Sequence, residues 1–101
     1  MQHARNQFAS CPCCGQRLLK RHGIALSPRL ADLFDMIERA GQRGIATEVL
    51  ADIFYPGKSL EAARLCVREN IYHLNTRLAE TDLEVRASRY EPYRVVRVRR
   101  S

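Results

Sequence analysis

The spacing of apolar residues changes once along this chain, at Thr81-Asp82. Before that point Val67, Ile71, Leu74 and Leu78 recur at intervals of four, three and four, the spacing of a buried stripe on a helix. After it, apolar and polar residues alternate, which is typical of a strand with one buried face. We therefore expect a chain that forms helices first and a terminal β-structure second.

Three helices are expected before the change of period. The first is predicted to begin at Ser27, a good N-cap followed by Pro28, and to end near Ala40, where Gly41 and Gly44 follow. Its apolar face is formed by Leu30, Leu33, Phe34 and Ile37.

The second and third helices are separated by a turn at 55–58. Thr47 is the predicted N-cap of the short second helix, whose apolar face consists of Val49, Leu50, Ile53 and Phe54. The third helix is predicted to begin after Ser59 and to run to about Glu80. On its helical wheel Leu65 points away from the buried stripe.

A terminal hairpin is expected after Asp82. Alternation predicts a strand at 83–87, a turn at 89–92 and a second strand from Tyr93. The apolar phase slips by one residue between Val95 and Val96, which predicts either a bulge or a strand end buried on both faces. Three helices followed by a hairpin describe an α+β winged helix-turn-helix.

The chain of 101 residues has room for one domain. We divide it into a basic, cysteine-containing arm at 1–26, a winged helix-turn-helix domain at 27–98 and a basic tail at 99–101. The sequence has no apolar run long enough to span a membrane and no apolar stretch of signal-peptide length near Met1. We therefore expect a cytoplasmic protein without a membrane partner.

The net charge of +6 favours an acidic partner, and 15 of the 17 basic residues are arginine. Residues 1–26 carry +4, residues 27–55 carry −2, and 56–78 and 79–101 carry +2 each. Arginine pairs well with phosphates and with guanine edges, so this distribution favours nucleic acid. Solubility alone is the competing explanation. No phosphate-binding glycine loop, paired-carboxylate motif or nucleophile elbow is found, and we expect no enzymatic activity.

The arm contains one candidate metal motif. Cys11 and Cys14 have the spacing of a zinc knuckle, with His22 the nearest further candidate ligand. A closed zinc site needs four ligands, and His3, Cys66 or another subunit would have to complete it. Such a knuckle could also contact RNA, which is a third and weaker functional hypothesis.

A resemblance to a known family follows from the helices and the hairpin. Residues 67–78 resemble the recognition helix of the OmpR/PhoB-type winged helix-turn-helix DNA-binding domain, and 26–34, 50–55 and 83–95 are similar to its first helix, second helix and wing. The resemblance covers about residues 26–96. Two departures are Glu91-Pro92, which stands in place of the wing glycine, and the receiver domain, for which we expect no room.

This resemblance implies sequence-specific binding of double-stranded DNA by a small bacterial or prophage-type transcriptional regulator, with the third helix in the major groove and the wing on the backbone. A homodimer would increase specificity. The implied DNA-binding residues are Arg64, Arg68, Glu69, Tyr72, His73, Thr76, Arg86, Arg89, Arg94 and Arg97.

The alternative is a winged-helix module that docks on the transcription machinery, such as an RNA polymerase subunit, or on another regulator. An outward Leu65, a phosphate-repelling Glu69 and the Glu91-Pro92 pair favour this alternative. Salt dependence distinguishes the two, because only DNA binding weakens steeply with salt.

Overall fold

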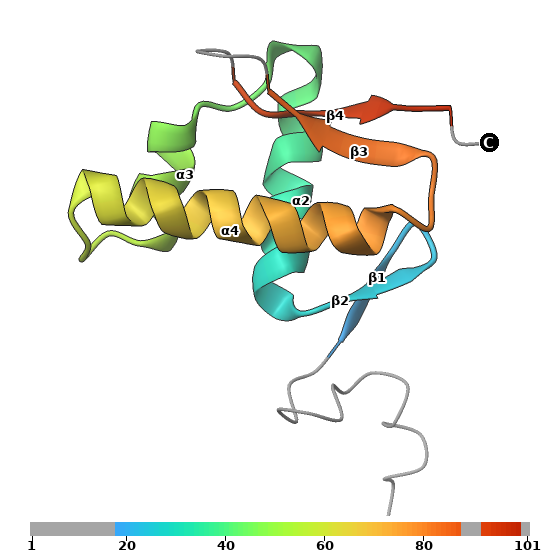
Figure 1. The fold of residues 1–101 in the computed structure, drawn as a ribbon, viewed down its shortest axis with the longest axis horizontal. Helices are drawn as coiled ribbons and strands as arrows, with labels where there is room; N and C mark the ends of the chain where they lie inside the picture. Colours follow the sequence, from blue (N-terminus) through green and yellow to red (C-terminus); the bar gives the residue numbers. More distant parts are fainter. Residues whose placement is uncertain (1–17, 88–91, 100–101) are drawn as a thin grey trace, which may run out of the picture.

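The computed structural model of the chain describes residues 18–87 and 92–99. Its elements, in chain order, are β1 (Leu19–Arg21), β2 (Ile24–Leu26), α2 (Pro28–Ala40), the 3-10 turn η2 (Gly41–Arg43), α3 (Thr47–Phe54), α4 (Leu60–Leu78), β3 (Leu83–Arg86) and β4 (Arg94–Arg97). Three helices followed by a β-hairpin confirm the α+β winged helix-turn-helix fold predicted from the change in apolar spacing (Figure 1).

A hairpin inside the region assigned to the arm precedes the helices. β1 and β2 pair antiparallel and are joined by His22 and Gly23, whose φ angles are 52° and 84°. Two consecutive residues with positive φ form the kind of turn that matches the twist of a tight hairpin. Ile24 and Leu26 of β2 are buried, so the packed domain begins before residue 27.

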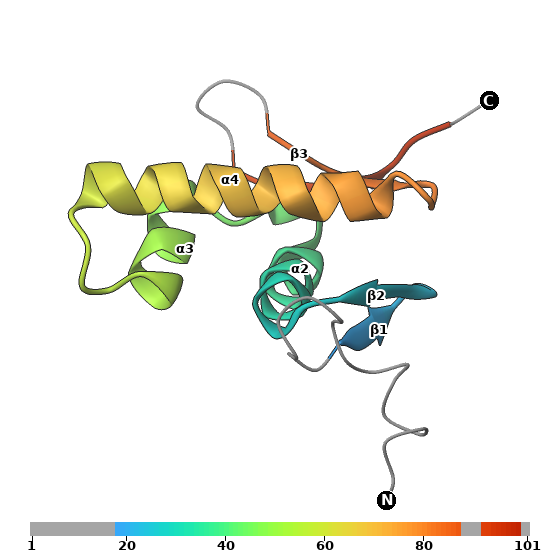
Figure 2. The same cartoon turned by 60° about the horizontal axis from the view of Figure 1, so that its bottom comes forward.

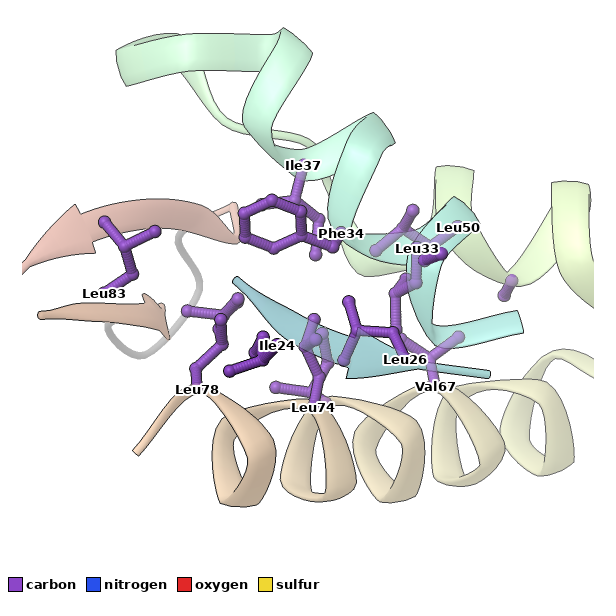
Figure 3. Close-up of a cluster of buried hydrophobic side chains, with 14 of the residues drawn as sticks. Ile24, Leu26, Leu33, Phe34, Ile37, Leu50, Val67, Leu74, Leu78 and Leu83 are labelled. Atoms are coloured by element: carbon purple, nitrogen blue, oxygen red, sulfur yellow. The ribbon is translucent and has the colours of Figure 1, made fainter. Parts of the chain in front are cut away.

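The core lies between α2, α4 and β2. Phe34 and Ile37 of α2 are fully buried and point toward Leu74 and Leu78 of α4, with Leu26 of β2 between the helices (Figure 3). The stripe predicted on the third helix is confirmed, since all four of its residues are buried. Each fully buried side chain of this size contributes about 1.5–3 kcal/mol of hydrophobic stabilisation.

The predicted helix starts are correct at two of three sites. The Ser27 hydroxyl accepts from the Leu30 amide and the Ser59 hydroxyl from the Ala62 amide. The prediction for Thr47 is wrong, because Ala46 is the N-cap of α3 and makes no side-chain cap bond. α4 ends at Leu78, two residues before the predicted end.

The C-terminal hairpin is regular over its four residue pairs, from Leu83↔Arg97 to Arg86↔Arg94. This constant register excludes a bulge within β4, and Val95 and Val96 are both half-buried, as a strand covered on two faces requires. A bridge between Ile45 and Tyr93 ties the hairpin to the segment that follows η2.

Gly44 makes this bridge possible. Its φ of 77° and ψ of 177° lie in a region that is essentially restricted to glycine. A Cβ at this position would lie 2.8 Å from the carbonyl oxygen of Tyr93 and 2.9 Å from Cβ of Pro92. The chain can therefore pass the base of β4 only where there is no side chain.

The two hairpins lie on opposite sides of α4, which crosses α2 (Figure 1). Arg77 of α4 donates to the carbonyl of Ala25 in β2 at 2.9 and 3.2 Å. Among the helices of the described residues, none is long and apolar enough to cross a membrane.

Candidate nucleic-acid interface

α2 and α3 both lie on the same side of α4 (Figure 2). Five of the predicted DNA-binding residues lie on its outward part and are all exposed. They are Arg68, Glu69, Tyr72, His73 and Thr76, and we call them the outward stripe. Their spacing of one and three or four residues places them side by side on the helix surface over two turns.

The outward stripe is rich in groups that can hydrogen-bond to a ligand. Tyr72 has 69% of its surface exposed and packs edge-on against His73, with 5.5 Å between ring centroids. Thr76 donates its hydroxyl to the carbonyl of Tyr72 at 3.0 Å. The Thr76 hydroxyl therefore keeps only its acceptor capacity, whereas the Tyr72 hydroxyl and the His73 ring can each donate or accept.

Arg64 is predicted at the same interface but is held by α3. Its Nη2 lies 2.5 Å from Oε2 of Glu48, and both side chains are about half exposed. The pKa of Glu48 is lowered, first by the hydrogen bond from its own backbone amide and then by that from Arg64. Glu48 stays ionised at neutral pH and offsets the charge of Arg64.

Two arginines of the wing are engaged in the same way. Arg86 donates from Nε to Glu84 at 2.8 Å, and Arg97 forms an ion pair with Asp82. Arg94 is half-buried on β4 and forms no ion pair with a described residue. The prediction for Arg89 lies outside the described residues.

These pairings change the electrostatics inferred from the sequence. Three of the arginines assigned to DNA binding have a carboxylate as nearest charged neighbour, so their charges are partly offset. Arg68 is the cation of the outward stripe, and no described carboxylate pairs with it. The interface is therefore less basic than a count of arginines indicates.

Two apolar side chains on α3 face outward, contrary to the prediction from the sequence. Val49 and Ile53 were predicted to lie on its apolar face, but they are 45% and 48% exposed. The buried residues are Leu50 and Ala51, with Phe54 partly buried beside them. α3 is thus turned by about one residue from the predicted orientation, which leaves two β-branched side chains on the surface.

Asn75 connects α4 to the wing, a contact that was not predicted from the sequence. Its side-chain oxygen accepts from the amide of Val85 at 2.8 Å, and its nitrogen donates to the carbonyl of Val85 at 3.0 Å. An asparagine on the flank of a helix gives no signal for such a contact. These two hydrogen bonds fix β3 against the helix that carries the outward stripe.

The candidate zinc ligands are not brought together in the part of the chain that is described. Cys11 and Cys14 lie outside it, and so does His3. Nε2 of His22 lies 2.8 Å from Oε2 of Glu38, so a metal at that nitrogen would have to displace this carboxylate contact. Residues 18–87 and 92–99 contain no group of three or more His, Cys, Asp or Glu side chains that could hold a metal ion. Cys66 is half-buried on α4.

Comparison of the chain with protein-family models, with curated proteins and with solved structures finds no match. The function must therefore be inferred from the residues and their arrangement.

Proposed function

We propose that the chain is a transcriptional regulator of the OmpR/PhoB type that binds double-stranded DNA, with α4 in the major groove. The observation that carries this proposal is the outward stripe, an exposed row of hydrogen-bonding side chains on α4, whose opposite face is buried in the core. A helix of this width fits the major groove, where base edges present distinct patterns of donors and acceptors.

The members of the stripe suit different parts of a duplex. Arg68 can donate two bonds to a guanine edge, and Glu69 can accept from a cytosine amino group. Tyr72, His73 and Thr76 can bond to phosphate or to a base edge. Glu69 repels phosphate, so it favours a register in which it faces bases and not the backbone.

The wing would position the helix on the DNA. Arg94 is available for phosphate, and Arg86 and Arg97 can exchange their carboxylates for phosphate oxygens. Because Asn75 holds β3 against α4, the hairpin and the recognition helix would dock as one rigid unit. The proposal requires no catalytic step. It also places the protein in the cytoplasm, with a second copy bound to a paired half-site.

A salt titration with matched variants tests this function. The full chain is titrated onto a fluorescent mixed-sequence duplex at 50 and 200 mM salt, as wild type, Arg68→Ala and Arg39→Ala. Arg39 is an exposed arginine of the last turn of α2, so its variant removes the same charge away from the stripe. We expect Arg68→Ala to weaken binding about tenfold and to lower the salt slope by about one unit, with less than a twofold effect of Arg39→Ala. Equal losses in the two variants would contradict binding through α4.

A second candidate function is a protein-docking module of the transcription machinery. It is favoured by the exposed apolar side chains Val49, Ile53, Leu60 and Leu65, which are 45%, 48%, 47% and 58% exposed. Such residues contribute little to DNA binding and more to a protein interface. If the chain is such a docking module, Leu65→Ser weakens binding to the partner protein by a factor that does not change with salt concentration. The affinity for the duplex stays unchanged.

A further inference from the structure

Within the described part of the chain, the C-terminal strand β4 pairs with another strand along one side only. β3 occupies one edge, and the amide of Val98 donates to the carbonyl of Asp82 at 2.8 Å on that same edge. On the other edge Tyr93 exchanges two bonds of 2.9 Å with Ile45. Backbone groups alternate in direction along a strand, so those of Val95 and Arg97 point the same way as those of Tyr93.

Among the described residues no strand pairs with the outer edge of β4 beyond Tyr93, and η2 lies close to β4. Among the described residues β4 belongs to a two-stranded sheet with β3, and the single bridge at Ile45 is its only other pairing. By contrast, the outer edge of β3 is blocked at Val85 by the Asn75 side chain. Val95 and Arg97 therefore offer two successive donor and acceptor pairs in the direction in which Ile45 has begun a third strand.

The surface beside β4 is hollowed, and η2 forms one wall of the hollow. A hollow of about 460 Å³ lies there, lined by Gln42 of η2 and by Arg94, Val95, Val96 and Arg97. Neighbouring strands lie about 4.7–4.9 Å apart, so an extended segment in the hollow would reach the backbone groups of β4. Gln42 adds a side-chain donor and acceptor at the other wall.

The positive charge of the arginines along this edge favours an acidic partner. Arg94, Arg97 and Arg99 follow one another within six residues, and the acid that offsets this charge is Asp82, paired with Arg97. A second copy of β4 would bring its own arginines against these, and like charges across strands are destabilising. Acidic side chains on the incoming strand would instead be attracted.

We propose that the outer edge of β4 binds an extended, acidic peptide segment of a partner protein by strand addition. Main-chain bonds to Val95 and Arg97 supply the affinity, and the arginines of the strand supply the preference for acidic residues. This interaction differs from DNA binding by the outward stripe because it requires backbone pairing along β4. It shares Arg94 and Arg97 with the phosphate contacts proposed for the wing, so peptide and duplex would compete for these two side chains.

The test uses the full chain and a capped fluorescent peptide in which Glu and Val alternate over ten residues. The control peptide has the same charge but carries N-methyl groups on its central amides, so it cannot pair with a strand edge. We expect the first peptide to bind at least tenfold more tightly than the second. Equal binding would show attraction by charge alone and would overturn the proposal.

Hydrogen exchange provides the direct readout. On peptide binding the amides of Val95 and Arg97 should exchange at least tenfold more slowly, while the amide of Val96, which faces β3, changes little. Unchanged exchange at Val95 and Arg97 in the bound state would overturn strand addition. If both amides are already protected without peptide and sedimentation shows a dimer, the edge binds a second copy of the chain. This result would also overturn the proposal.

Two charge variants complete the test. Arg94→Glu should weaken binding of the acidic peptide at least tenfold, and Arg39→Glu, with the same charge change on α2, should weaken it less than twofold. Equal effects of the two variants would overturn the role of the edge arginines.

Discussion

The side chain of Asn75 bonds to both the amide and the carbonyl of Val85, at 2.8 and 3.0 Å, and so takes the place of a neighbouring strand. The contact spans ten residues of sequence and joins the candidate recognition helix to the wing. A single side chain thereby sets the orientation of the two elements that would contact DNA together.

Replacing Asn75 should loosen the wing. Asn75→Ala leaves the amide and carbonyl of the buried Val85 without their partner, and we expect a loss of about 1–3 kcal/mol in the free energy of unfolding. Asn75→Asp keeps the acceptor for the Val85 amide but sets a carboxylate oxygen against the Val85 carbonyl, so it should also lose stability. Urea denaturation measures the stability of both variants, with Glu80→Ala at an exposed position as the control. An unfolding midpoint of Asn75→Ala equal to that of the wild type would contradict a stabilising role of the Asn75–Val85 bonds.

Gly44 should tolerate no side chain, whereas Gly23 should be less sensitive. Both have positive φ, but only a Cβ at Gly44 meets backbone, at 2.8 Å from the Tyr93 oxygen. We expect Gly23→Ala to lower stability by about 1–2 kcal/mol, the cost of the left-handed conformation, and Gly44→Ala to lower it further. Thermal unfolding of the two variants checks the order, and the reverse order would be inconsistent with the close approach at β4.

The Arg21–Asp35 pair should make stability depend on pH in the acid range. Arg21 donates from Nε and Nη2 to the two carboxylate oxygens at 2.8 and 2.9 Å, and these bonds lower the pKa of Asp35. Because the folded-state pKa is below the unfolded one, the contribution is complete above about pH 4 and is lost as the pH falls through the folded value.

Unfolding at pH 7 and pH 2.5 tests this pair. Asp35→Asn should be less stable than the wild type at pH 7 and equal to it at pH 2.5. Asp32→Asn, on an exposed position of the same helix, is the control and should show little difference at either pH. A constant difference between Asp35→Asn and the wild type would argue against the linkage.

Glu48 should restrain DNA binding. Glu48→Gln releases Arg64 and removes a negative charge, and we expect tighter binding to a duplex by about threefold with a steeper salt dependence. Asp52→Asn removes the same charge from an exposed position on α3 and should have a smaller effect. Weaker binding of Glu48→Gln would place Arg64 away from the DNA.

The sequence predicted those features that depend on local periodicity. The stripe from Val67 to Leu78, the Ser27 and Ser59 caps and the terminal hairpin were all found because each leaves a pattern within one element. The hairpin at 19–26 was missed because three-residue strands are too short to show alternation.

Features that depend on tertiary contacts could not be predicted in this way. Val49 and Ile53 were misplaced because an α3 of eight residues allows several apolar faces, and the position of α4 decides which one is buried. The Arg64–Glu48 pair joins residues 16 apart, so nothing local marks it. The outward direction of Leu65 was predicted correctly, because the exposed face of α4 is the complement of its buried one.

The central claim, that the outward stripe of α4 contacts DNA, is tested most directly by mapping amide and side-chain chemical-shift changes while an unlabelled duplex is added to the labelled chain. We predict that the largest changes fall on Arg68, Glu69, Tyr72, His73 and Thr76 and saturate together. Largest changes on Val49, Ile53 and Leu65, or none on α4 while the duplex is bound, would contradict it.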